Sequence, residues 1–109
     1  MDLSDYQQRS RATAVYPDAG ANLTYPALGL CGEAGEVAEK VKKAIRDDGG
    51  VLTDARRDAL AGELGDVLWY VAQLATEAGL DLDAVAAGNL AKLRSRQERS
   101  VLSGSGDTR

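Results

Sequence analysis

The chain has 109 residues, the length of one domain, because two half-length domains would each bury too little apolar surface to fold. It contains no histidine, which excludes imidazole-based nucleophile systems and histidine-ligated zinc or iron. Its single cysteine, Cys31, excludes an internal disulfide and a cysteine-cluster metal site, and we expect it to be a small buried residue rather than a nucleophile. Any catalysis must therefore use carboxylates, hydroxyls, lysine, arginine or a hard metal ion.

Charge and aromatic content exclude further classes of protein. The formal net charge is −4, and aromatic residues make up only 5% of the chain, with no phenylalanine. A nucleic-acid-binding domain needs a basic surface or a row of stacking rings, so no nucleic-acid partner is expected. The first five residues lack a basic and apolar leader, and no apolar run approaches the roughly 20 residues that span a bilayer. We therefore expect a soluble cytoplasmic protein without a membrane partner.

Apolar residues recur at helical spacing through most of the chain, and no alternating pattern of strand length is present. The expected helices cover about residues 3–15, 25–46, 54–78 and 82–101. Their expected N-caps are Asp2 or Ser4, Thr53 or Asp54, and Asp81, while glycines 49–50 and 79 end the second and third helices.

Four helices joined by short connections predict an all-α, four-helix antiparallel bundle over residues 1–102. Residues 103–109 are expected to form a short Gly/Ser C-terminal tail. A bundle of this size buries only about 60–65% of the surface of its unfolded chain. Helices with apolar residues left over then tend to pair between chains, so a homodimer or homotetramer is expected.

Two pairs of carboxylates occupy matching positions on the second and third helices. Glu33 and Glu36 are spaced i, i+3, as are Glu63 and Asp66, so each pair lies one turn apart on one side of its helix. In both helices the pair directly precedes residues of the apolar stripe, along the edge of the buried face. If the two stripes pack against each other, the four carboxylates converge on one groove.

Four acids at the edge of an apolar seam repel one another unless a cation lies among them. Their oxygen ligands suit Mg²⁺, with Mn²⁺ as a substitute. The alternative interpretation is a solvated acidic face, the ordinary one for any single pair of this spacing. Glycine in a helix costs about 1 kcal/mol relative to alanine, so glycines near the acids indicate close backbone approach. These are Gly29, Gly32, Gly35, Gly62 and Gly65.

Polar and basic side chains near these acids favour a polyanionic ligand. Lys40 and Lys43 continue the line of the second helix, where they either pair with a glutamate four residues earlier or bind phosphate. On the fourth helix, Asn89 falls within the apolar stripe, so it needs a hydrogen-bond partner on a neighbouring helix or a ligand. Lys92 and Arg96 extend its polar edge, although basic residues equally suit the C-terminal half of a helix.

The aromatic residues offer candidates for a nucleobase pocket. Tyr70 lies on the same edge as Glu63 and Asp66, within reach of whatever a metal there would hold. Trp69 points away from the apolar stripe, which places it either at an interface between subunits or against a base. The base pocket itself stays open among six residues: Tyr6, Gln7, Tyr16, Tyr25, Trp69 and Tyr70.

The two acidic pairs, with residues 37–62 between them, resemble the signature of the MazG-like all-α nucleoside triphosphate pyrophosphohydrolases. The likeness includes residues 25–30, 32–36, 63–70 and 89–93 and covers about residues 5–102. It implies a four-helix fold that dimerises, often as a dimer of dimers, with helices of both subunits building the site. It also implies Mg²⁺ held by Glu33, Glu36, Glu63 and Asp66, nucleotide contacts from Asn89 and Lys92, and a C-terminal segment, 104–107, that folds towards the site.

The resemblance implies Mg²⁺-dependent hydrolysis of nucleoside or deoxynucleoside triphosphates to monophosphate and pyrophosphate, in the role of nucleotide-pool cleaning. Glu33 or Glu36 is the expected proton acceptor. Phosphate or nucleotide contacts are expected from Lys40, Lys43, Tyr70, Asn89, Lys92 and Arg96. The superfamily also includes dUTPases and phosphoribosyl-ATP pyrophosphohydrolases, whose substrates remain alternatives. Outside enzymes, the alternatives are a helical module that binds metal or nucleotide without turnover and a bundle that serves oligomerisation alone.

Overall fold

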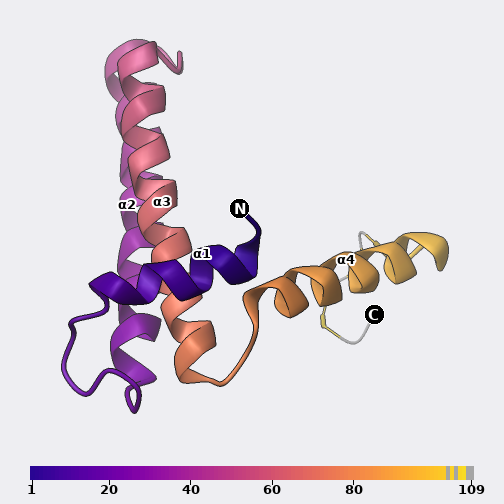
Figure 1. The fold of residues 1–109 in the computed structure, drawn as a ribbon. Coiled ribbons are helices and arrows are strands. Elements are labelled where there is room, and N and C mark those ends of the chain that lie inside the picture. Colours follow the sequence, from indigo (N-terminus) through magenta and orange to yellow (C-terminus); the bar gives the residue numbers. More distant parts are fainter. Residues whose placement is uncertain (103, 105, 108–109) are drawn as a thin grey trace.

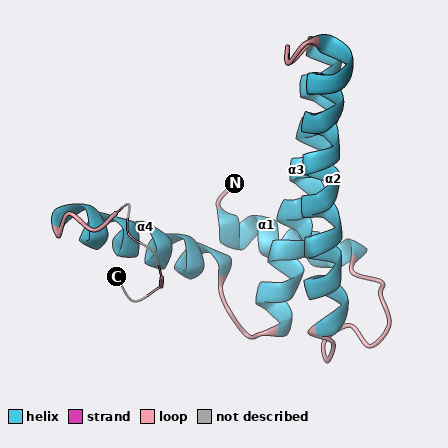
Figure 2. Cartoon of the chain, turned by 180° about the vertical axis from the view of Figure 1, so that it is seen from behind, coloured by secondary structure: helices cyan, strands magenta, loops and turns pink. Residues whose placement is uncertain are grey.

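The computed structural model of the protein describes residues 1–102, 104, 106 and 107. All regular secondary structure in that part is helical, as predicted, and no strand is assigned in it (Figure 2). The elements are α1 (Leu3–Ser10), the short 3-10 helix η1 (Arg11–Thr13), α2 (Thr24–Asp48), α3 (Asp54–Glu77) and α4 (Leu82–Glu98). Among these described helices, none combines the length and the apolar character needed to cross a membrane.

The helix ends follow the predicted caps, and the structure decides between the alternatives. Asp2 rather than Ser4 caps α1, because its carboxylate accepts a first-turn N–H at 2.7 Å. Thr53 rather than Asp54 caps α3 in the same way, at 3.2 Å. Gly49 ends α2 at φ +62°, a left-handed conformation that glycine adopts without steric cost.

Two helices end earlier than predicted. α1 stops at Ser10 and continues as η1, instead of running to about residue 15. The Ser10 hydroxyl donates to the Gln7 carbonyl and accepts the Gln73 side chain of α3 at 2.7 Å, so α1 is tied to α3 where it ends. Such side-chain bonds compete with the backbone ladder and favour an end to the helix. α4 stops at Glu98 rather than near residue 101, and Ser100 follows with a left-handed φ of +60°.

α2 and α3 form an antiparallel pair that packs along its length, and α1 lies across α3 (Figure 1). α4 leaves one end of this pair and runs outward, with α1 as its main packing partner. The radius of gyration is 16.7 Å, against about 13 Å for a compact domain of this length. A single chain is therefore a helical pair with α1 across it and α4 extending away from one end, and not the closed antiparallel bundle that short connections predict.

The buried core lies where α1, α3 and α4 meet. It consists of Ala72, Ala75 and Leu82, against which Leu3, Tyr6 and Val71 pack. Elsewhere, large apolar side chains remain open to solvent along both the helical pair and α4: Leu28, Val41, Ile45, Leu64, Leu68, Val85, Leu90 and Leu93. One copy of the chain leaves these apolar faces uncovered, which is the condition under which pairing between chains is predicted.

Candidate functional site

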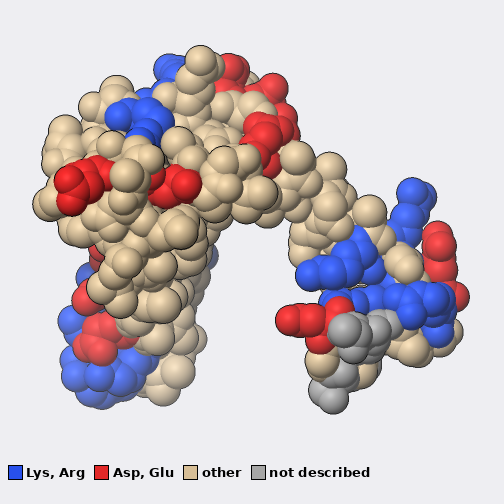
Figure 3. Space-filling model, turned by 90° about the horizontal axis from the view of Figure 1, so that it is seen from below, with Lys and Arg blue, Asp and Glu red and all other residues tan. Residues whose placement is uncertain are grey.

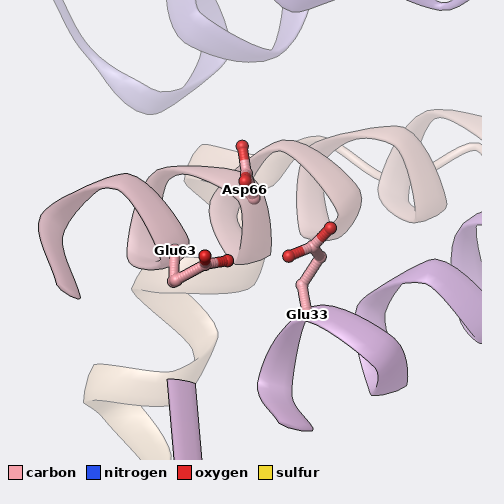
Figure 4. A group of neighbouring side chains, drawn as sticks. All are labelled: Glu33, Glu63 and Asp66. Carbon is pink, nitrogen blue, oxygen red and sulfur yellow. The ribbon is translucent and has the colours of Figure 1, made fainter. Parts of the chain in front are cut away.

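Three carboxylates from two helices meet between α2 and α3. Glu33 projects from α2 toward Glu63 and Asp66 on α3 (Figure 4), and one oxygen of each lies within 4.8 Å of the other two. The i, i+3 spacing places Glu63 and Asp66 on one side of α3, and the packing of α2 brings Glu33 opposite them. These three residues are called the carboxylate group below. Glu36, the fourth predicted member, is exposed and lies outside it.

Like charges dominate the surroundings of Glu33. Burial raises its pKa above the ordinary value, and a hydrogen bond with Glu63 and the charges of Asp66, Glu63 and Glu36 raise it further. The Lys40 ammonium lies 3.8 Å from a Glu63 oxygen and compensates part of this charge. The repulsion that remains is of the kind that a divalent cation relieves.

The two candidate phosphate-binding lysines of α2 have different partners. Lys40 reaches across to Glu63 on α3, and not to Glu36 four residues earlier. Lys43 pairs within its own helix, with Glu39 at 3.8 Å. The structure therefore brings Lys40 to the carboxylate group and leaves Lys43 in a surface ion pair of α2.

Four aromatic rings lie together at the α1 side of the helical pair: Tyr16, Tyr25, Trp69 and Tyr70, called the aromatic cluster below. Tyr16 and Tyr25 stack with ring centroids 4.9 Å apart and planes 12° apart. Trp69 and Tyr70 meet edge to face at 5.0 Å. Contacts of 6.4 Å from Tyr16 to Trp69 and from Tyr25 to Tyr70 close the cluster.

Tyr70 joins the aromatic cluster to the carboxylate group. Its pKa is raised first by burial, then by neighbouring Tyr25, and then by the charges of Glu33 and Asp66. Its ring packs on the backbone of Gly29 in α2, where an added Cβ would overlap the ring. This is the close helix approach for which a glycine is needed, and it places a tyrosine hydroxyl near the carboxylates.

The structure separates the other base-pocket candidates. Trp69 donates its indole N–H to the Thr13 hydroxyl at 2.9 Å, so it packs within its own chain. Gln7 is buried and donates to Thr76 and to the Leu80 carbonyl, which makes it a bridge from α1 to the end of α3. Tyr6 packs against the core, where burial and the charge of Asp66 raise its pKa. The four rings of the aromatic cluster are thus the candidates that lie together.

A comparison with protein families decides the affiliation. The model of the MazG nucleotide pyrophosphohydrolase domain matches residues 23–101, the part of the chain that contains α2, α3 and α4. The chain belongs to this family. The match includes the whole carboxylate group, whereas α1 and Tyr16 precede it. The description of the MazG family names a type of chemistry, the hydrolysis of nucleotides with release of pyrophosphate.

One relative aligns with this chain over its whole length. The Gene 37 protein of Mycobacterium phage L5 is 51% identical over 114 residues, and the alignment covers 100% of both proteins. Its name states no activity. No solved structure matches the chain. The residues of this MazG domain are therefore what bears on its substrate.

α4 lies within the MazG match, but its predicted ligand residues lie apart from the carboxylate group. Asn89 and Lys92 are exposed on the part of α4 that runs outward from the helical pair (Figure 1). Arg96 is only 5% exposed and donates to the main-chain oxygen of Asp107 at 2.8 Å. Basic side chains gather over α4 (Figure 3). The structure thus places Arg96 against the C-terminal segment, and it brings neither Asn89 nor Lys92 to the carboxylates within one chain.

The C-terminal segment is described only in part. Asp107 contacts α4 through Arg96, so this residue does not lie at the carboxylate group. Residues 103, 105, 108 and 109 of the predicted Gly/Ser tail lie outside the described residues.

Two predictions about α2 and α3 are wrong within one chain. Cys31 is exposed and not buried, because the side of α2 that carries it is not covered by another described element. Close approach holds for Gly29 alone among the five glycines near the acids. At the other four, an added Cβ would meet nothing within 4 Å: Gly32, Gly35, Gly62 and Gly65.

Glu77 ends α3 with a fully buried carboxylate and was not among the predicted site residues. A signal for it exists in the spacing along α3. Glu63, Asp66, Tyr70, Gln73 and Glu77 follow one another at intervals of three, four, three and four residues, which is one continuous line on a helix. The polar line that begins at the carboxylate group therefore continues through the aromatic cluster to Glu77.

Proposed function

We propose that this protein hydrolyses nucleoside or deoxynucleoside triphosphates to the monophosphate and pyrophosphate, with Mg²⁺ as its cofactor. Membership of the MazG family supports the type of reaction. The observation that carries the proposal is the convergence of Glu33, Glu63 and Asp66 from two helices. Three carboxylates held this close are unfavourable unless a cation or a proton offsets their charge.

The donor set suits Mg²⁺. It offers carboxylate oxygens alone, the ligands that hard ions prefer, and it presents them from helices rather than from loops. Beyond burial, the pKa of Glu33 is raised by facing negative charges, and a cation removes that cause. When bound, Mg²⁺ supplies charge neutralisation for phosphate oxygens and lowers the pKa of the attacking water. Mn²⁺ shares the preference for oxygen and is the expected substitute.

We assign different tasks to the two glutamates of α2. Glu33 belongs to the carboxylate group and serves as a ligand. Glu36 lies one turn further along α2, is exposed and remains outside the group, so its carboxylate is left to accept a proton from the attacking water. Lys40, beside Glu63, is placed to pair with a phosphate oxygen once the carboxylates are neutralised.

The aromatic cluster supports a substrate that carries a base. Tyr25 keeps 43% of its surface exposed while its ring belongs to a cluster that reaches the carboxylate group through Tyr70. An exposed ring next to a phosphate-binding centre suits stacking of a nucleobase. The biological role that we propose is nucleotide-pool cleaning, with dUTP and phosphoribosyl-ATP as alternative substrates.

The working form that we propose is a homodimer or homotetramer. The uncovered apolar side chains of the helical pair and of α4 support association, since one chain leaves them in water. Asn89 and Lys92 are exposed on α4, which has α1 and not the α2–α3 pair as its main packing partner. In an assembly, α4 of one copy is available to bring these two residues to the carboxylate group of another.

The test is a turnover assay over ribo- and deoxynucleoside triphosphates, dUTP and phosphoribosyl-ATP, with pyrophosphate and orthophosphate measured separately. We expect monophosphate and pyrophosphate in the presence of Mg²⁺. Both Glu33→Gln and Glu36→Gln should lower kcat by about 100-fold or more, because each removes a charged group from the reacting centre. Mn²⁺ affinity, measured by calorimetry, should fall in Glu33→Gln and stay near the wild-type value in Glu36→Gln.

The matched control is Glu98→Gln on α4, which removes an exposed glutamate whose ion pair among the described residues is with Arg94, and it should change neither quantity. Unchanged Mn²⁺ affinity in Glu33→Gln would contradict the metal assignment. Nucleotide binding without turnover across the whole panel would instead favour a module that binds nucleotide without hydrolysing it.

A further inference from the structure

Glu77 is a buried carboxylate outside the carboxylate group. Its side chain has no exposed surface. One oxygen accepts the Tyr16 hydroxyl at 2.6 Å and the Gly20 N–H at 2.8 Å, with the Arg11 guanidinium 3.7 Å away. The other oxygen is buried and has no hydrogen-bond partner of good geometry among the described residues, while the Asn22 N–H also approaches the carboxylate and helps to lower the pKa of Glu77. Burying this charge costs free energy that its hydrogen bonds offset, and both of these bonds come from one connection of the chain.

Glu77 holds the connection between η1 and α2, residues 14–23, at two points. The Tyr16 hydroxyl donates to Glu77 and accepts from Arg11 at 2.8 Å, so both of its bonds fix the ring in one place. The Gly20 N–H is the second point, and Gly20 has φ +102°, which an L side chain adopts only with strain. The connection is thus tied to the end of α3 by a single carboxylate.

The segments that Glu77 holds at Tyr16 and Gly20 both contact Tyr25. Tyr16 is 7% exposed and stacks on the Tyr25 ring, with the two ring planes 12° apart. Two residues after Gly20, Asn22 accepts the Tyr25 N–H at 3.0 Å through its side chain. Tyr25 is therefore held both by its ring and by its backbone, while part of its surface remains exposed.

We propose that Glu77 is a positioning residue for nucleotide binding, which holds Tyr16 and the 14–23 connection so that the Tyr25 ring is presented to the nucleobase. The proposal rests on the proposed function. It explains why the polar line of α3 continues from the carboxylate group past Tyr70 to Glu77, although Glu77 itself touches no substrate. Arg11, Tyr16 and Gly20 precede residue 23, so this support comes from a part of the chain that the family model does not match.

The experiment compares Glu77→Gln, Tyr16→Phe and the double variant with the wild type, using the preferred triphosphate. Tyr16→Phe keeps the stacking ring and removes only the hydroxyl link. Each single variant should raise KM about tenfold, the effect of losing one hydrogen bond to a charged group, with kcat within about twofold of the wild type. The double variant should raise KM no further, because both substitutions break the same link.

Trp69 provides a second measurement, since it is the only tryptophan and contacts both Tyr16 and Tyr70. Its fluorescence should change when the nucleoside monophosphate is added and stay constant with ribose 5-phosphate. The concentration for half-saturation should rise about tenfold in Tyr16→Phe and Glu77→Gln. This binding measurement needs no turnover, so a failure of the proposed hydrolysis and a failure of the positioning role are distinguishable.

The matched control is Thr76→Val, which removes the hydroxyl that accepts from Gln7, next to Glu77 in the chain, without touching Tyr16 or Gly20. It should lower stability and leave both KM and the fluorescence titration unchanged. Wild-type KM and half-saturation in Tyr16→Phe would overturn the proposal, even if Glu77→Gln fails to fold. So would equal losses of affinity in Thr76→Val, and so would fully additive effects in the double variant.

Discussion

The α2–α3 pair and α4 differ in how much of their packing one chain provides. α2 and α3 cover each other along their length, and they hold the carboxylate group and three rings of the aromatic cluster. α4 packs mainly on α1, near its start, where Leu82 enters the core. Further along, Leu90 is 69% exposed. The difference shows which part of the site a single chain assembles and which part depends on another surface.

The lysines of the two regions illustrate this contrast. Lys40 of α2 is half-buried and lies 3.8 Å from Glu63, so its position is set by the packing of α3. Lys92 of α4 is exposed on the outward-running helix. A side chain in the first setting is preorganised, whereas one in the second acquires a fixed place only when a partner packs against it.

The largest effect is expected from variants that test whether α4 of one copy contacts the α2–α3 pair of another copy in an assembly. Glu63→Gln, in the helical pair, should lower kcat/KM by about 100-fold or more, because it removes one of three charged ligands. Lys92→Gln, on α4, should lower it about tenfold through loss of one charge-assisted contact. When the two variants are unfolded together and refolded as a mixture, activity should exceed the sum of the separate proteins. The gain arises because a mixed assembly contains sites with both residues intact.

Each variant refolded alone is the control for this mixture, and light scattering gives the mass of the assembly. A mixture that merely averages the two activities would show that α4 serves its own chain, and the proposed contact across copies would be wrong.

The next effect compares one glycine from each region. Gly29→Ala should destabilise the protein by about 1–3 kcal/mol, because the new Cβ overlaps the Tyr70 ring. Gly88→Ala, inside α4, should stabilise it by up to about 1 kcal/mol through helix propensity, since an added Cβ there meets nothing within 4 Å. Urea denaturation of both variants measures the two free energies of unfolding. If Gly88→Ala instead lowers the free energy of unfolding, another copy of the chain must pack close to that face of α4.

The smallest effect concerns the pH dependence of stability. Hydrogen bonds from Tyr16 and from the Gly20 N–H lower the pKa of Glu77 below its ordinary value in the folded state. Its ionised form is therefore favoured by folding, so its contribution is present above the unfolded pKa, near 4.5, and is lost as pH falls through the lower folded pKa. Glu77→Gln should be less stable than the wild type at neutral pH, and this gap should narrow below about pH 4.5. Thermal unfolding across pH 3–7 measures it, and a gap that stays constant would contradict the shifted pKa.

Local patterns predicted much of this fold. The caps at Asp2, Thr53 and Asp81 were predictable because a side chain that accepts a first-turn N–H acts within four residues of chain. The i, i+3 spacing of Glu63 and Asp66 likewise places both carboxylates on one side of a helix without knowledge of its neighbours. Helix positions and the relative order of side chains along each helix are therefore local properties.

Other features depend on how helices meet. Glu33 joins the carboxylate group and Glu36 does not, although both precede residues of the same apolar stripe. The choice is made by the register of α2 on α3, which also pairs Lys40 with Glu63 instead of Glu36. Glu77 escaped prediction because its partners come from the 14–23 connection, far away in sequence.

The amino-acid order alone thus accounts for an all-α chain, its four helices, its caps and an acidic centre on the second and third helices. Tertiary structure decided which three carboxylates meet, which lysine faces them, and that α4 runs outward rather than closing a bundle. The physical reason is the distance along the chain over which each kind of interaction acts. Hydrogen bonds and spacing within a helix act over one or two turns, whereas register, burial and charge pairing between helices arise only when distant segments pack together.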